Sequence, residues 1–123
     1  MPVRVVDASA LGALVFGEPK AEEIAEALAE AQIAAPALLW YELANLCLGK
    51  IKAHPTQRDQ ILGAFELARR LTIQIVKVDH PAIVELAEQT GLTTYDASYL
   101  WLARHLDGEL ITFDKRMGKA MGR

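Results

Sequence analysis

The chain has 123 residues, of which 52% are hydrophobic and 24% are charged, and its net charge is −3. These values predict a single domain over residues 1–123 with a sizeable core, and they exclude a disordered chain and an overall basic field, although not a local basic patch. The single cysteine, Cys47, excludes an internal disulfide. Asp7 interrupts the only early apolar run and no longer run could span a membrane, so we expect a cytoplasmic protein.

Short apolar strands alternate with helices along the chain. In chain order we expect a strand over 3–6, helices over 8–16 and 20–31, a strand over 33–35, a helix over 36–48 that Gly49 closes, a helix over 56–71 capped by Thr56, a strand over 73–78, helices over 79–91 and from 93 or 94 to 106, a strand over 110–113 and a helix over 115–121. Strands that are apolar on both sides predict a parallel sheet with helices on both faces, an α/β fold. Ligands of such sheets bind beyond the carboxyl ends of the strands.

Four carboxylates stand where an ordinary carboxylate is least expected. Asp7 follows the first strand, Asp114 follows the last, Asp96 lies in the first turn of its helix, and Glu42 is the only acid in an apolar helix. Each also has a plain structural explanation, because an Asp at a helix start caps free N–H groups and a glutamate can reach solvent from a narrow polar face. Asp79 also follows a strand, and there Pro81 makes a helix start the sufficient explanation.

Parallel strands would bring these carboxylates together. Two carboxylates about 4 Å apart repel each other by about 4 kcal/mol at an effective dielectric constant of about 20, and no lysine or arginine stands beside all four in the sequence. A divalent cation would relieve this repulsion, and oxygen ligands favour Mg²⁺ or Mn²⁺. The three histidines, His54, His80 and His105, lack metal-ligand spacing. A water molecule activated by such a metal can attack a phosphodiester.

Further polar residues lie beside the four acids. The hydroxyls of Ser9 and Thr112 could orient a carboxylate, and Asn45 shares a helix face with Glu42; a helix start, a strand position and a solvent-facing amide are the alternative explanations. The C-terminal tail KRMGKAMGR carries basic residues, some of which we expect to hold an RNA backbone near the acids, unless they are only solvated surface: Lys115, Arg116, Lys119 and Arg123.

Four segments in this order resemble the PIN-domain ribonucleases, and closely the VapC toxins of toxin–antitoxin pairs: VVDASALGALVFGEP, LLWYELANLCLG, GLTTYDASYLWLARHL and LITFDKRMG. The resemblance implies a three-layer α/β/α fold with strand order 3-2-1-4. It implies an endoribonuclease that uses Mg²⁺ or Mn²⁺, with Asp7, Glu42, Asp96 and Asp114 as the acidic quartet and Thr112 and Asn45 as supporting positions. It further implies RNA as substrate and a VapB-like antitoxin as inhibitor.

Other functions fit the sequence less well. A haloacid-dehalogenase-type phosphatase needs a second aspartate where Ser9 stands, and a receiver domain needs an acidic pair after the first strand, where Ala8 follows Asp7. A non-catalytic PIN-like module that binds RNA or protein remains as the alternative. The helix over 36–48 is apolar nearly all round, so we expect it to be covered on more than one side, in part by a second copy of the chain in a homodimer.

Overall fold

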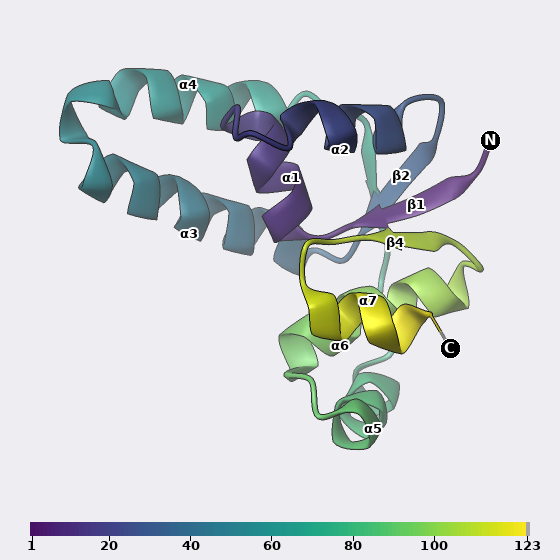
Figure 1. Ribbon diagram of the computed structural model, residues 1–123. Helices are drawn as coiled ribbons and strands as arrows, with labels where there is room; N and C mark the ends of the chain where they lie inside the picture. Colours follow the sequence, from purple (N-terminus) through teal and green to yellow (C-terminus); the bar gives the residue numbers. More distant parts are fainter. Residues whose placement is uncertain (123) are drawn as a thin grey trace.

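The computed structural model describes residues 1–122 and contains a four-stranded parallel sheet. The strands are β1 (Val3–Val6), β2 (Gln32–Ala35), β3 (Ile73–Ile75) and β4 (Glu109–Ile111), in the order β3-β2-β1-β4. Figure 1 shows that all four strands run toward the same edge, so the chain returns through helices between each strand and the next in sequence. The predicted parallel sheet and its strand order 3-2-1-4 are confirmed.

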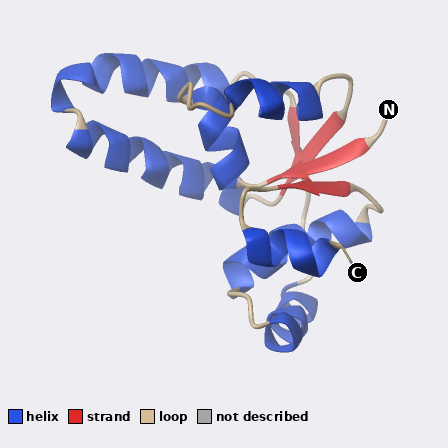
Figure 2. Cartoon of the chain, viewed as in Figure 1, coloured by secondary structure: helices blue, strands red, loops and turns tan. Residues whose placement is uncertain are grey.

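Helices cover the sheet on both faces. They are α1 (Ala8–Val15), α2 (Ala21–Leu28), α3 (Leu38–Ala53), α4 (Arg58–Ala68), α5 (His80–Thr90), α6 (Thr94–His105) and α7 (Lys115–Met121), with a short 3₁₀ turn, η1 (Pro55–Gln57), between α3 and α4. Figure 2 shows the strands between α1, α2 and α4 above and α5, α6 and α7 below. This is the predicted three-layer α/β/α arrangement.

Burial along β1 shows why both faces must be covered. Val5 and Val6 point to opposite faces of the sheet, because successive side chains of a strand alternate, and both are fully buried. The core continues on one side into Leu11 of α1 and on the other into Leu100 of α6, neither of which is exposed to solvent. A polar residue at either valine would face an apolar layer, so the run of apolar residues in β1 is a requirement of the three-layer fold.

β3 is shorter than predicted and β4 is placed earlier than predicted. In both cases the strand ends at the residue that pairs with the last residue of the neighbouring strand. The strand predicted over 73–78 ends at Ile75, which pairs with Ala35, because β2 stops there before Pro36; only the backbone N–H of Val76 still reaches the Ala35 carbonyl, at 3.0 Å. The strand predicted over 110–113 occupies Glu109–Ile111, because Ile111 pairs with Val6 at the end of β1.

Helix ends differ from the prediction as well. Gly49 does not close the third helix, which continues to Ala53, because one glycine costs a helix only about 1 kcal/mol and lysines in the last turn favour its C-terminus. One of these, Lys50, also pairs with Glu18 at 2.6 Å. Thr56 does not cap the next helix: Pro55 opens a 3₁₀ turn instead, and α4 begins at Arg58 without a side-chain cap. The helices predicted over 20–31 and 56–71 are correspondingly shorter.

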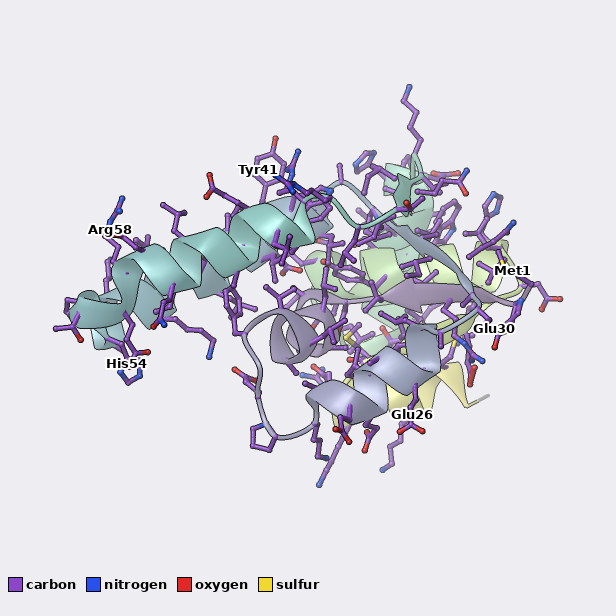
Figure 3. All side chains as sticks on the ribbon, turned by 90° about the horizontal axis from the view of Figure 1, so that it is seen from above. Met1, Glu26, Glu30, Tyr41, His54 and Arg58 are labelled. Atoms are coloured by element: carbon purple, nitrogen blue, oxygen red, sulfur yellow. The ribbon has the colours of Figure 1, made fainter. Side chains whose placement is uncertain are left out.

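The α3–α4 pair forms a hairpin that extends beyond the sheet (Figure 1). Figure 3 shows His54 and Arg58 at its tip, at the opposite end of the molecule from Met1 and Glu30. One face of α3 is buried, including Leu39 and Leu43, but its other face leaves large apolar side chains exposed. Within residues 1–122, none of the helices combines the length and the apolar character that crossing a membrane requires.

Candidate active site

Asp7 ends β1 and begins α1, and both of its carboxylate oxygens are fixed. Oδ1 accepts a hydrogen bond from Ser9 Oγ at 2.8 Å and from the Ala10 backbone N–H at 3.0 Å, while Oδ2 accepts one from Thr112 Oγ1. Asp7 is only 5% exposed, and this burial raises its pKa above the ordinary 3.8, against the lowering effect of the three hydrogen bonds. Asp7 is therefore a helix cap and also a buried carboxylate held in one orientation.

Thr112 links Asp7 to Asp114. Its hydroxyl donates to Asp7 and accepts from the Asp114 backbone N–H at 2.9 Å. Asp114 is the N-cap of α7, where its Oδ1 accepts from the backbone N–H groups of Arg116 at 2.8 Å and Met117 at 3.2 Å. The structure thus places Thr112 against Asp7, where the sequence predicts a supporting hydroxyl, and the same holds for Ser9. The Thr112 hydroxyl thus joins two strand ends that lie far apart in sequence.

Glu42 is held by a tyrosine that the sequence analysis missed. Tyr99 of α6 is 1% exposed, and its hydroxyl donates to Glu42 Oε1 at 2.6 Å, which joins α3 to α6. Burial and the neighbouring Glu42 carboxylate raise the pKa of Tyr99, so the hydroxyl remains a donor at neutral pH. The sequence did contain an indication of this role. Tyr99 lies three residues after Asp96 on the same helix face, and a buried tyrosine hydroxyl needs a hydrogen-bond partner.

Asp96 lies in the first turn of α6, after the N-cap Thr93. The Thr93 hydroxyl accepts from the Asp96 backbone N–H at 3.1 Å, so the capping explanation accounts for Thr93. It does not account for the Asp96 carboxylate, which is half-buried and faces the other acids. Burial raises the pKa of Asp96, and the charges of Asp114 and Asp7 raise it further.

All four acids line one cavity of about 660 Å³ at the carboxyl edge of the sheet. This volume lies within the range of roughly 300–1,000 Å³ that is usual for ligand sites. The other lining residues are Ala8, Ser9, Leu38, Tyr41, Asn45, Leu46, Tyr95, Tyr99 and Phe113. The structure therefore brings together the predicted quartet, Ser9 and Asn45, with Thr112 directly behind Asp7.

Repulsion between the acids is not relieved by any cation in the cavity wall. Burial raises the pKa of Glu42, and the charges of Asp96 and Asp7 raise it further, whereas the Tyr99 hydroxyl lowers it. The charge of Asp114 likewise raises the pKa of Asp7. Among the described residues, no lysine, arginine or histidine lines the cavity. The site is thus a pocket of mutually repelling carboxylates.

The donor set of this cavity suits Mg²⁺ or Mn²⁺. Its acidic side chains offer oxygen only, and among the described residues no cation in the cavity wall balances their charge; Arg116, outside the cavity, lowers the pKa of Asp96 only against larger raising effects. Within residues 1–122, no group of three or more His, Cys, Asp or Glu side chains is arranged to hold a metal ion by itself. Mg²⁺ does not require such a cage, because it keeps several waters and binds through one or two carboxylates.

The predicted RNA-binding cations lie outside the cavity. Lys115 and Arg116 are exposed at the start of α7, directly after Asp114, but neither lines the acidic cavity. The Arg116 side chain donates to the Gly91 carbonyl at 2.5 Å and shares a second groove with Lys119. Gly91 ends α5 in a left-handed conformation, with φ of 76°, and its carbonyl is free to accept this bond. Arg123 lies outside the described residues.

Comparison with known proteins gives consistent matches over nearly the whole chain. A family model described as PIN domain matches residues 4–122. The protein named ribonuclease VapC3 from Pyrobaculum aerophilum is 31% identical over 121 residues, which cover 94% of this chain and 92% of the relative.

Solved structures agree with the fold. The crystal structure of PAE2754 from Pyrobaculum aerophilum matches with a TM-score of 0.77 at 23% identity, over 94% of this chain and 82% of that one. A toxin–antitoxin complex from Klebsiella pneumoniae matches with a TM-score of 0.62 at 26% identity, over 90% of this chain and 86% of the matched one.

Proposed function

The chain belongs to the PIN domain family, in its VapC branch, and we propose that it is a metal-dependent endoribonuclease toxin. One observation carries the proposal. The four acids of the sequence prediction come from four different elements and line one cavity whose described wall holds no cation. A fold has no structural need for such a group, since two of its members, Glu42 and Asp96, cap no helix with their carboxylates.

Asp7, Glu42, Asp96 and Asp114 would hold Mg²⁺ or Mn²⁺. The bound cation would supply Lewis-acid stabilisation of the phosphodiester and activation of the attacking water. The chain's own part is orientation: Ser9 and Thr112 fix Asp7, and α7 fixes Asp114. On the other wall, Tyr99 fixes Glu42, so three of the four carboxylates are positioned before any ligand arrives.

The proposed partners are RNA, a VapB-like antitoxin and a second copy of the chain in the cytoplasm. The matched Klebsiella pneumoniae structure is a toxin–antitoxin complex, which supports an antitoxin partner here. An antitoxin arginine or lysine placed among the acids would neutralise the charge that otherwise binds metal. The homodimer is supported by apolar side chains left exposed on the hairpin, Leu48 on α3 and Leu67 on α4, which are 48% and 64% exposed.

Amide substitution of the acids tests the proposal. Asp96→Asn and Asp114→Asn should each lower Mg²⁺-dependent cleavage of a mixed RNA substrate by about 100-fold or more, since loss of a residue that only supports a metal ligand already costs about 10- to 100-fold. Folding should survive, because asparagine can replace Asp114 as the cap of α7 and the Asp96 carboxylate caps no helix. The matched control is Asp79→Asn, which changes another N-cap aspartate, the one that accepts from Ala82 N–H at the start of α5, outside the cavity.

The outcome separates the ribonuclease from the non-catalytic module. Loss of cleavage in the site variants and in EDTA, with full activity in Asp79→Asn, supports the enzyme. A folded native chain that binds RNA but does not cleave it with Mg²⁺ or Mn²⁺ would favour the binding module instead. Full activity in Asp96→Asn or Asp114→Asn would remove that residue from the site.

A further inference from the structure

Two exposed tyrosines stand beside the acids. Tyr41 is 76% exposed and Tyr95 is 61% exposed, and both line the acidic cavity. Each directly precedes an acid on its own helix, Glu42 on α3 and Asp96 on α6. Neighbouring side chains on a helix point about 100° apart, so each ring lies on the rim of the cavity next to its acid.

This exposure is not explained by the fold. Single exposed apolar side chains are common, but here two aromatic rings from helices far apart in sequence converge on one cavity. Figure 3 shows Tyr41 at the junction of the α3–α4 hairpin and the body. Neither hydroxyl makes a hydrogen bond to another group among residues 1–122, whereas the third tyrosine, Tyr99, is buried and bonded to Glu42. The rings of Tyr41 and Tyr95 are thus free to contact a ligand with their faces.

The negative charge of the cavity limits the ways in which it can attract RNA. A phosphate backbone that approaches four carboxylates is repelled, and no lysine or arginine among the described residues lines the cavity to offset this. Lys115, Arg116 and Lys119 lie in α7 and do not line the cavity, and of these the charge of Arg116 acts on Asp96. The nearest cations stand outside the wall, Arg116 acting on Asp96 and Lys20 over the Phe113 ring, so the wall itself can attract RNA only through a bound metal and through contacts that do not depend on charge. Tyrosine rings provide such a contact with nucleobases, since every base has a π-face.

We propose that Tyr41 and Tyr95 are stacking platforms for two nucleobases that flank the phosphodiester held at the acids. The inference rests on the proposed ribonuclease function and adds which part of the chain holds the substrate. It also defines the substrate: the flanking nucleotides are unpaired, because bases inside an A-form duplex already stack on one another and present no free face. Phe113 and Leu38 add apolar side chains to the lining of the same cavity.

Affinity for RNA tests the platforms separately from cleavage. The probe is a short, unstructured, fluorescently labelled RNA, measured by anisotropy in Mg²⁺ on an Asp114→Asn background, and the same sequence annealed into a duplex. Tyr41→Leu and Tyr95→Leu keep apolar bulk but remove the ring. Each should weaken single-strand binding by about 5-fold to about 150-fold, the range expected for loss of one base-stacking contact. Tyr41→Phe and Tyr95→Phe keep the ring and should rescue the affinity.

Two further readouts distinguish stacking from other roles. The salt dependence of binding should be the same in the leucine variants, because stacking releases no counterions, and their affinity for the duplex should not change. The matched control is Val84→Ala, which alters another exposed apolar side chain, on α5 and outside the acidic cavity.

Native single-strand affinity in both leucine variants would overturn the proposal. So would a lower molecular mass of these variants in light scattering with unchanged RNA affinity, which would assign the rings to a protein interface. Ring-dependent binding by a chain that never cleaves would refute the nuclease activity and leave the platforms supported. Cleavage that is indifferent to both rings would refute the platforms alone.

Discussion

The bond between Tyr99 and Glu42 should contribute measurably to stability and to metal binding. It joins α3 to α6 across the cavity at 2.6 Å, and Tyr99 is 1% exposed while Glu42 is half-buried. The substitution Tyr99→Phe removes one oxygen and leaves the ring that packs in the core. The Glu42 carboxylate then keeps its burial but loses its only side-chain donor among residues 1–122.

A hydrogen bond to a charged group contributes roughly 1.5–3 kcal/mol. Water can reach the half-buried Glu42 and replace part of the lost bond, so we expect the lower end, about 1.5 kcal/mol. An unfolding entropy of about 2.1 cal/mol/K per residue over this chain converts that loss into a fall in Tm of about 6 °C. Loss of the donor also raises the pKa of Glu42 further, because the Tyr99 hydroxyl lowers it in the native chain. Half-maximal activity should then require more Mg²⁺.

Thermal unfolding followed by circular dichroism at pH 7 in EDTA measures the first effect. Tyr41→Phe is the matched control, since it removes a hydroxyl that is exposed and unbonded in the described structure, and its Tm should match that of the native chain. Combining Tyr99→Phe with Glu42→Gln in a double-mutant cycle isolates the coupling between the two side chains. A Tm for Tyr99→Phe equal to that of the control, with no coupling in the cycle, would refute the reasoning.

Three further predictions concern charge and assembly. In EDTA, Tm should fall as the pH rises from about 4 to 7, because burial raises the pKa of three site carboxyls above the ordinary 3.8 or 4.5, so the native state retains protons that the unfolded chain has already released. Added Mg²⁺ should reverse this fall in Tm. A Tm that rises between about pH 4 and 7 would contradict the predicted direction. Reversing the charges of Lys115 and Arg116 should weaken single-strand RNA binding and flatten its log–log salt slope by about 1.4, and an unchanged slope would exclude a phosphate contact. Light scattering at micromolar concentration should give a dimer that Leu48→Lys weakens, whereas a mass that stays at the monomeric 13.5 kDa would leave the exposed face of α3 without a partner.

Much of the fold follows from local pattern. The apolar run at β1 ends in Asp7, and the same local rules placed Asp79 before α5 and Thr93 before α6 as helix caps, as the structure confirms. Asp7, Asp114 and Glu42 could be selected from the sequence because a carboxylate directly after an apolar strand, or alone in an apolar helix, is a local pattern. Asp96 stands in the first turn of a helix, where capping is an equally good explanation. The ends of helices and strands were less predictable from the sequence. β4 stops where its partner β1 stops, and α3 continues through Gly49.

Tertiary structure alone decided which side chains meet. Nothing within several residues of Glu42 indicates its partner, because Tyr99 lies 57 residues away and reaches it only when the N-terminal halves of α3 and α6 come together. The same holds for Thr112, whose bond to Asp7 spans 105 residues through the pairing of β1 with β4. Local sequence fixes helices and their caps because their hydrogen bonds are local, and it indicates strands by their apolar pattern, whereas the pairing of strands joins distant residues. The electrostatics of the cavity depend on burial and on distances across the sheet, which only the packed chain defines.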